Sequence, residues 1–388
     1  MAVVKVVWNK ILYGVIRPLF DIIYGMEKPS LIAGIDTLLN LNDTKADINS
    51  FLNTYFDENI ERSRMLDERY GHLWVNIKRQ ANAGGKRLRP YFVMLAYTAY
   101  KGTDYKKLIP VAAAHELLHI SLLIHDDIID KDYMRHGQTN LAGNMKNDYL
   151  NRGAHTNAEH FGNSAALLAG DLLLSGAYQM VLQSQLSDKD KISALNNIAE
   201  AIFLVGGGEF LDTESSVIPV TNEQVLKIAD LKTARYSFVI PLITGAELAG
   251  ASRAELVLLE EFGIALGIAF QLADDMLGVY GNPKLTGKST LSDIREGKHT
   301  FLILQALQKA SAADRKTLQK HLGNPLLTSA QAIEVQDILE RSGAKAKCVQ
   351  QIQLYAAQAS RILGTLAMPV HAKKVFISMI ERATERTS

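Results

Sequence analysis

The sequence has few of the residues that build disulfide-linked, metal–thiolate or strand-rich proteins. Its 388 residues include one cysteine, Cys348, which excludes an intramolecular disulfide and a multi-cysteine metal site. Only nine prolines occur, and alternating strand-like runs between hairpin turns are scarce. Acidic and basic side chains nearly cancel, 41 against 42, so no global field attracts nucleic acid. A reducing cytoplasm is the expected compartment.

The N-terminal segment is expected to form neither a clean membrane span nor a signal peptide. Its first 26 residues are apolar, but basic residues and Asp21 interrupt them every few positions, and no small-residue cleavage site follows. A helix here could lie in a membrane interface, with its cations facing headgroups at the inner face, or pack on its own domain. We expect residues 1–60 to form an N-terminal helical extension to one large domain, residues 61–388.

Long apolar segments of helical period dominate the rest of the chain. Examples are "VAAAHELLHISLLIHDDIID" and "SAALLAGDLLLSGAYQMVLQSQL". Their apolar faces are broad and rich in Ala, Leu and Ile, which is typical of helices buried among other helices. The pattern predicts an all-α protein, an antiparallel helix bundle with an interior.

Two aspartate clusters interrupt these apolar helices. "HDDIID" contains Asp126, Asp127 and Asp130, and "FQLADDMLG" contains Asp274 and Asp275. Asp126 and Asp130 are four residues apart and therefore project from one helix face. Unpaired carboxylates repel each other and are costly to desolvate, so cations must come to them. Hard oxygen ligands suit Mg²⁺, which is typically shared with substrate phosphates, so the pair of clusters indicates a metal–diphosphate site.

Basic groups that could hold a diphosphate recur beside glycines and near the acidic clusters. "GGKRLRP" places two glycines before Lys86, Arg87 and Arg89, where backbone N–H groups can approach an anion at a helix start. Further candidates follow the clusters or precede them: Arg135, Lys232, Lys288 and Lys298. Taken singly, each is an ordinary surface charge, and their shared setting favours a binding role.

The chain resembles the trans-isoprenyl diphosphate synthases over most of residues 80–300. "GGKRLRP", "HDDIID" followed by "RHG", "KTARYSFVIPL", "FQLADDMLG" and "TGKSTLSDIREGK" occur in that family's order and spacing. The last two segments are most similar to the short-chain geranylgeranyl type. The resemblance implies antiparallel helices around a deep central cavity, a homodimer, and a catalytic domain that spans residues 61–388.

The resemblance also implies roles for individual residues. Three Mg²⁺ ions, with Mn²⁺ as a substitute, and the allylic diphosphate would be bound by Asp126, Asp127, Asp130, Asp274 and Asp275, with Lys232 as a further catalytic residue. Isopentenyl diphosphate would be bound by Lys86, Arg89 and His119. The allylic diphosphate or the closing loops would be contacted by Arg135, Lys232, Thr233, Gln271, Lys288 and Lys298.

One position departs from the family pattern. A second arginine usually follows Arg135 and helps to hold isopentenyl diphosphate, whereas His136 stands there in this chain. Because a histidine is often neutral near pH 7, His136 would be a weaker and pH-dependent anion contact.

The expected reaction joins isopentenyl diphosphate head-to-tail to dimethylallyl, geranyl or farnesyl diphosphate, with release of diphosphate. Product length would depend on what blocks the cavity beneath the aspartates. The residues five and four positions before Asp126 are Ser121 and Leu122, neither of them aromatic. They leave room for a long chain, so a C20 product is favoured over C15.

Two other functions remain as alternatives. A terpene cyclase is also a helical Mg²⁺ enzyme, but it needs neither "GGKRLRP" nor a second aspartate pair. A catalytically silent subunit of a heteromeric synthase would be expected to lose aspartates or lysines, and this chain keeps them.

Overall fold

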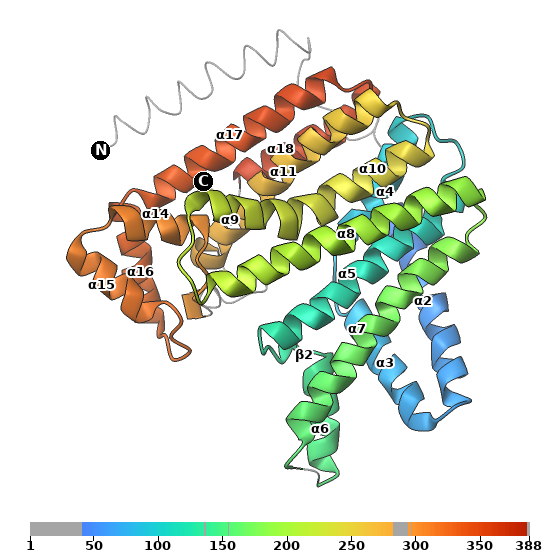
Figure 1. Cartoon of the computed structure of the whole chain (residues 1–388), viewed down its shortest axis with the longest axis horizontal. Coiled ribbons are helices and arrows are strands. Elements are labelled where there is room, and N and C mark those ends of the chain that lie inside the picture. Colours follow the sequence, from blue (N-terminus) through green and yellow to red (C-terminus); the bar gives the residue numbers. More distant parts are fainter. Residues whose placement is uncertain (1–40, 136, 154, 282–293, 296, 386–388) are drawn as a thin grey trace. The chain divides into compact units, whose positions relative to one another are not determined.

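The computed structural model describes residues 41–135, 137–153, 155–281, 294–295 and 297–385. Within these ranges the chain is almost entirely helical, which confirms the predicted all-α fold (Figure 1). The single sheet in the described part is a hairpin of two short strands, Met134–Arg135 (β1) and Gln138–Thr139 (β2). Two residues with predicted roles, His136 and Lys288, lie outside the described residues.

The helices follow one another with short connections. The first half of the chain forms α2 (Leu41–Arg64), α3 (Glu68–Asn82), α4 (Leu88–Ala99), the 3₁₀ turn η1 (Tyr105–Leu108), α5 (Ile109–Ile129), α6 (Leu141–Asn151) and α7 (Ala158–Gln183). The second half forms α8 (Asp188–Ser215), α9 (Asn222–Ala229), the π-helix η2 (Asp230–Val239), α10 (Ile240–Leu248), α11 (Arg253–Tyr280), α14 (Phe301–Lys309), α15 (Ala312–His321), α16 (Ser329–Arg341), α17 (Ala344–Thr365) and α18 (Val370–Glu385).

Side-chain caps explain where several of these helices begin. The Ser187 hydroxyl accepts a hydrogen bond from the Asp190 amide at the start of α8, and Ser252 does the same at the start of α11. Thr221 and Gln224 form a reciprocal capping box at the start of α9. Each cap satisfies backbone N–H groups that have no partner within the helix.

Helix α5 lies in the middle of the bundle and carries the first aspartate cluster at its C-terminal end. It packs on α4 and most extensively on α7, while η2 packs between α8 and α11. Figure 1 shows α5, α7 and α8 side by side, with α11 and α17 on the other side of α8 and α9. Helices α5, α8 and η2 thereby surround one interior space.

Among the described residues, three helices are long and apolar enough, by length and composition alone, to cross a membrane. They span Tyr105–Ile129, Ala158–Gln183 and Arg253–Tyr280, and 67%, 50% and 61% of their most apolar windows are buried inside the protein. Apolar runs of this kind are also typical of buried core helices. The packing of these helices within the bundle accounts for most of their apolar character.

The predicted start of the large domain at residue 60 falls inside a helix. Helix α2 is continuous from Leu41 to Arg64 and packs on α3 and α5. Ile48, Leu52 and Phe56 are fully buried there. Residues 41–60 are therefore part of the same bundle, and residues 1–40 of the predicted extension lie outside the described residues.

Candidate active site

The first aspartate cluster is arranged around the C-terminal turn of α5. Helix α5 ends at Ile129, and the amide of Asp130, its C-cap, donates to the carbonyl of Asp126. The Asp126 carboxylate lies 3.6 Å from the Lys232 ammonium, and the Asp130 carboxylate lies 3.5 Å from that of Lys298. The two aspartates that share a helix face thus each meet a predicted lysine.

Asp127 turns to another side and is almost fully buried. It accepts hydrogen bonds from Arg135 at 2.8 and 2.5 Å and from the Gln80 amide at 3.3 Å. Burial raises the pKa of Asp127, and the Arg135 ion pair opposes that rise. Arg135, on β1, also lies 3.5 Å from Asp126. The Arg135 guanidinium therefore bridges the carboxylates of Asp126 and Asp127.

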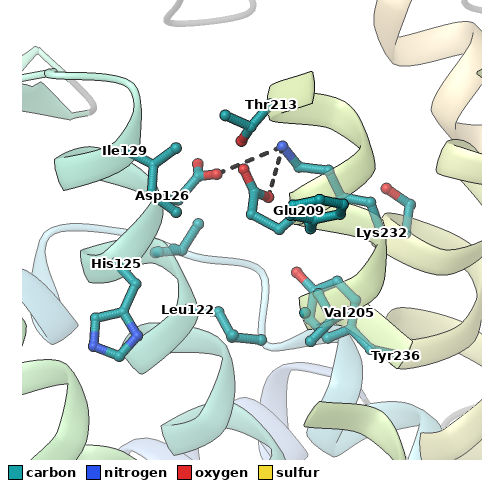
Figure 2. A pocket seen from close by; sticks show the side chains of 13 residues that line it. Leu122, His125, Asp126, Ile129, Val205, Glu209, Thr213, Lys232 and Tyr236 are labelled. Atoms are coloured by element: carbon teal, nitrogen blue, oxygen red, sulfur yellow. Dashed lines mark ion pairs between the residues drawn. The ribbon is translucent and has the colours of Figure 1, made fainter. Parts of the chain in front are cut away.

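Lys232 is the most heavily paired cation of the site. Its ammonium lies 2.6 Å from Asp212 on α8. Figure 2 shows its two further ion pairs, with Glu209 of α8 at 2.8 Å and with Asp126. Burial alone would lower the pKa of Lys232, but the three carboxylates raise it above its usual value. The lysine is therefore charged at any physiological pH.

Glu209 and Asp212 were missed by the sequence reasoning. They lie in "GGGEFLD", where two acids three residues apart follow glycines on a largely apolar helix. This spacing of two acids after glycines is a weaker indication of a binding site than a repeated aspartate pair. Burial raises the pKa of Glu209, and the Lys232 charge opposes the rise. The structure thus adds a third acidic group to the two predicted clusters.

The second aspartate cluster lies on α11 and is linked to η2 by hydrogen bonds. The Thr233 hydroxyl donates to the Gln271 carbonyl oxygen at 2.5 Å, and the Gln271 amide donates to Asp275 at 2.8 Å. Asp274 beside it is exposed. Three residues predicted to act at one site are therefore joined in a single chain of contacts.

The basic loop before α4 separates its charged residues. Lys86 is exposed, whereas Arg87 is buried and forms an ion pair with Glu116 at 2.8 Å. Gly85 has a φ of 114°, and a Cβ there would lie 2.8 Å from the Arg87 guanidinium. A side chain at position 85 would therefore be strained and would collide with that pair.

Arg89 and His119 meet at one tyrosine. The Arg89 guanidinium donates to the Tyr236 hydroxyl and to Ser237, both at 2.7 Å, and His119 Nδ1 lies 3.4 Å from the same Tyr236 oxygen. Tyr236 was not predicted. Because it comes from η2, it connects the predicted isopentenyl-binding residues with the helix that carries Lys232 and Thr233.

A cavity of about 520 Å³ lies between α5, α8 and η2. Figure 2 shows Asp126, Glu209 and Lys232 together at one end, with Leu122 and Val205 at the other. Leu122 lines the cavity as expected for a length-determining residue. Ser121 does not line it, because its buried hydroxyl donates to the Gly170 carbonyl on α7 at 2.8 Å.

The carboxylates fit a metal that is shared with a ligand. Among the described residues, no group of three or more metal-binding side chains is close enough to hold an ion unaided. Mg²⁺ usually takes only one or two carboxylates and completes its shell with water and phosphate oxygens. The oxygen donors on α5 and α11 therefore suit Mg²⁺ that arrives with a diphosphate.

Comparison with known proteins decides the family. The polyprenyl synthetase model matches residues 73–340, more than half of the chain. The chain belongs to the polyprenyl synthetase family. It is 31% identical to a geranylgeranyl diphosphate synthase of Sulfolobus acidocaldarius over 303 residues, which are 77% of this chain and 83% of that protein. It is also 31% identical to a geranylfarnesyl diphosphate synthase of Aeropyrum pernix, over 78% of this chain and 91% of that protein.

Solved structures in the family agree with the fold. The geranylgeranyl pyrophosphate synthase of Corynebacterium glutamicum, complexed with isoprenyl diphosphate and magnesium, has a TM-score of 0.85 and 28% identity, covering 90% of this chain and 100% of that one. The predicted class, a short-chain trans-prenyltransferase, is confirmed. A terpene cyclase or a silent subunit is not favoured.

Proposed function

We propose that this enzyme condenses isopentenyl diphosphate with an allylic diphosphate and favours a C20 product. The observation that carries the proposal is the contact of Lys232 with Asp126 at the polar end of a cavity whose other end is apolar. A diphosphate suits the charged end, and a prenyl chain suits the apolar end. The named relatives act as geranylgeranyl and geranylfarnesyl diphosphate synthases, which supports a long product.

The two aspartate clusters would hold three Mg²⁺ ions, with Mn²⁺ as a substitute. The ligands would be Asp126, Asp127, Asp130, Asp274 and Asp275. When bound, these ions neutralise charge on the leaving diphosphate. Lys232, Thr233, Gln271, Lys288 and Lys298 would then surround the allylic diphosphate. The donor chemistry of the site and the magnesium in the C. glutamicum structure support this assignment.

The chain's own side chains would do three things in the reaction. Lys232 and Arg135 would stabilise negative charge as the allylic C–O bond breaks. Lys86, Arg89 and His119, with His136, would hold isopentenyl diphosphate so that its double bond faces the allylic carbon. The apolar wall at Leu122 and Val205 would exclude water from the cation. No nucleophilic side chain is needed, and the released diphosphate can take the final proton.

Leu122 would govern chain length from within the cavity, whereas Ser121 would act at most through the packing of α5 on α7. Their different placements support a larger role for Leu122. Phe92 and Met94 are fully buried in the core and do not line the cavity. They therefore offer no plug that would stop the chain at C15.

We further propose a homodimer that forms through α7 and α8. Several large apolar side chains on these helices are exposed: Leu167, Leu168, Leu182, Phe203 and Phe210. Exposed side chains of this size on two helices that pack on each other are typical of an interface. Sedimentation equilibrium should give twice the mass of 42.8 kDa, and a monomer would contradict this proposal.

The cellular setting completes the proposal. The catalytic domain would act in the cytoplasm, and the segment before residue 41 would bring it to the inner face of a membrane. The apolar and basic pattern of the first 26 residues supports this placement. Sedimentation of the full chain with anionic vesicles, compared with a chain lacking residues 1–40, tests it.

The catalytic proposal is tested by incubating the protein with Mg²⁺, isopentenyl diphosphate and each of dimethylallyl, geranyl and farnesyl diphosphate. Product length is then measured by mass spectrometry. The proposal predicts elongation that ends mainly at C20. An absence of elongation with every primer would refute it.

A further inference from the structure

The helix that carries Lys232 is wound as a π-helix over ten residues, Asp230–Val239. At its end the Ile240 amide donates to the Arg235 carbonyl, five residues back. Such helices are rare, they appear mostly as single turns within α-helices, and they occur frequently at functional sites. Something outside the local backbone must therefore hold η2 in this form.

Arg235 forms ion pairs on the side of η2 away from the cavity. Its guanidinium lies 3.2 Å from Asp230, five residues back on η2, and 2.7 Å from Glu260 on α11. Asp230 is buried and also receives the Lys227 ammonium of α9 at 3.0 Å. Arg235 does not line the cavity. Arg235 thus links two successive turns of η2 through Asp230 and links η2 to α11 through Glu260. Asp230 in turn links the same group to α9 through Lys227.

The spacing of this pair matches the π form specifically. In an α-helix of 3.6 residues per turn, side chains five residues apart point about 140° away from each other. In a π-helix the backbone bond joins residues five apart, so their side chains lie one above the other. The Asp230–Arg235 pair can therefore form while η2 is π-wound and is lost if the segment becomes α-helical.

The same spacing recurs on the cavity side. Lys232 and Ser237 are five residues apart, and both face the site: Lys232 binds Asp126, and Ser237 binds Arg89. In an α-helix these two would diverge by about 140°. The π winding therefore lets Ser237, in addition to Tyr236, reach Arg89 while Lys232 contacts Asp126.

Glycines on the two flanking helices make room for the wide helix. A Cβ at Gly208 of α8 would lie 2.5 Å from the Lys232 amide nitrogen, and one at Gly267 of α11 would lie 2.4 Å from the Ala234 Cα. Both contacts are with the backbone of η2, which cannot yield as a side chain could. The surroundings are thus shaped for the π form, independently of the ion pairs.

We propose that Arg235 is a positioning residue, which holds η2 in the π form through Asp230 and Glu260 and so fixes Lys232 against Asp126. For its kinetic part the inference rests on the proposed function. It predicts that Arg235 affects the rate of elongation only while the Lys232 side chain is present.

A double-mutant cycle tests this dependence. We expect Arg235→Ala to lower kcat of elongation roughly 10-fold to 100-fold, the loss typical of residues that orient a group in direct contact with a ligand. Arg235→Lys should recover part of the loss. In a chain that already carries Lys232→Ala, adding Arg235→Ala should change the residual rate less than about 2-fold, which is the non-additivity of coupled sites. Equal losses in both backgrounds would overturn the proposal.

Arg341→Ala is the matched control, because it removes another arginine–aspartate pair, to Asp314, between α16 and α15. It should leave kcat unchanged. A structure of Arg235→Ala provides a readout that needs no activity: we expect the Ile240 amide to bond Tyr236 in place of Arg235. A retained π-helix with Lys232 in place would overturn the proposal, whereas wild-type protein without any elongation would count against the proposed function alone.

Discussion

The Lys232 ammonium lies 3.6 Å from the Asp126 carboxylate and so joins η2 to the first aspartate motif on α5. Glu209 and Asp212 hold the same ammonium from α8. Three helices therefore converge on one charge at the mouth of the cavity. The Lys232 and Arg135 contacts explain why Asp126 and Asp127 are tolerated beside an apolar core, since each of these two carboxylates meets a cation.

Lys232→Ala should slow elongation roughly 100-fold to 1,000-fold, as the loss of a preorganised electrostatic group does in other active sites. The change leaves Asp126, Glu209 and Asp212 without their shared cation, so like charges repel where the diphosphate must bind. Steady-state rates with saturating substrates measure the effect. Lys345→Ala, which removes an exposed pair with Glu340, is the control and should keep the wild-type rate.

Leu122→Phe should shorten the main product from C20 to C15. The larger ring enters the cavity that Leu122 lines and fills space that the last isoprene unit needs. Ser121→Ala is the neighbouring control, because Ser121 bonds Gly170 outside the cavity. It should cost about 1 kcal/mol of unfolding free energy and leave product length unchanged. A C20 product from Leu122→Phe would show that another wall limits the chain.

Arg87→Met should destabilise the fold by roughly 3–5 kcal/mol, because it leaves Glu116 as a buried, unpaired charge. The double change Arg87→Met with Glu116→Leu should recover most of that free energy, since a buried ion pair can often be replaced by apolar packing. Urea unfolding measures both. An unchanged midpoint for Arg87→Met would contradict the inferred structural role.

His115 should make stability fall in acid. Burial, followed by the charge of Arg89, lowers the pKa of His115 from 6.5 to about 3. The folded state keeps His115 neutral while the unfolded state takes up a proton, so the free energy of unfolding decreases as pH falls from 6.5 towards 3. Urea midpoints between pH 8 and 4 should decline less steeply for His115→Leu. Parallel curves for the two proteins would contradict this assignment.

The sequence predicted the all-α fold, and it singled out residues that the structure brings close together, because both depend on strong local patterns. Helical periodicity marks α5, α7 and α11, and paired aspartates on apolar helices stand out against their surroundings. Three residues predicted to contact the allylic diphosphate or the closing loops lie against aspartates in the structure: Lys232 contacts Asp126, Lys298 contacts Asp130, and Gln271 contacts Asp275.

The features that the sequence did not predict depend on contacts between distant segments. Arg87 and Arg89 are two residues apart, yet Arg87 turns inward with a φ of 54° to meet Glu116, and only Arg89 faces the site. Glu209 becomes a site residue because η2 brings Lys232 to it. The π winding of η2 depends on tertiary ion pairs and on glycines of other helices, which local propensity does not encode.

The central claim is that the aspartates of α5 and of α11 bind one metal–diphosphate unit together. The most direct measurement is calorimetric titration with a non-reactive allylic thiodiphosphate, with and without Mg²⁺, for the wild type, Asp126→Ala and Asp274→Ala. We predict binding that requires Mg²⁺ and is weakened at least about 10-fold by either change, with turnover lowered by orders of magnitude and helical content retained. Wild-type affinity in Asp274→Ala, or tight binding without Mg²⁺, would contradict the account.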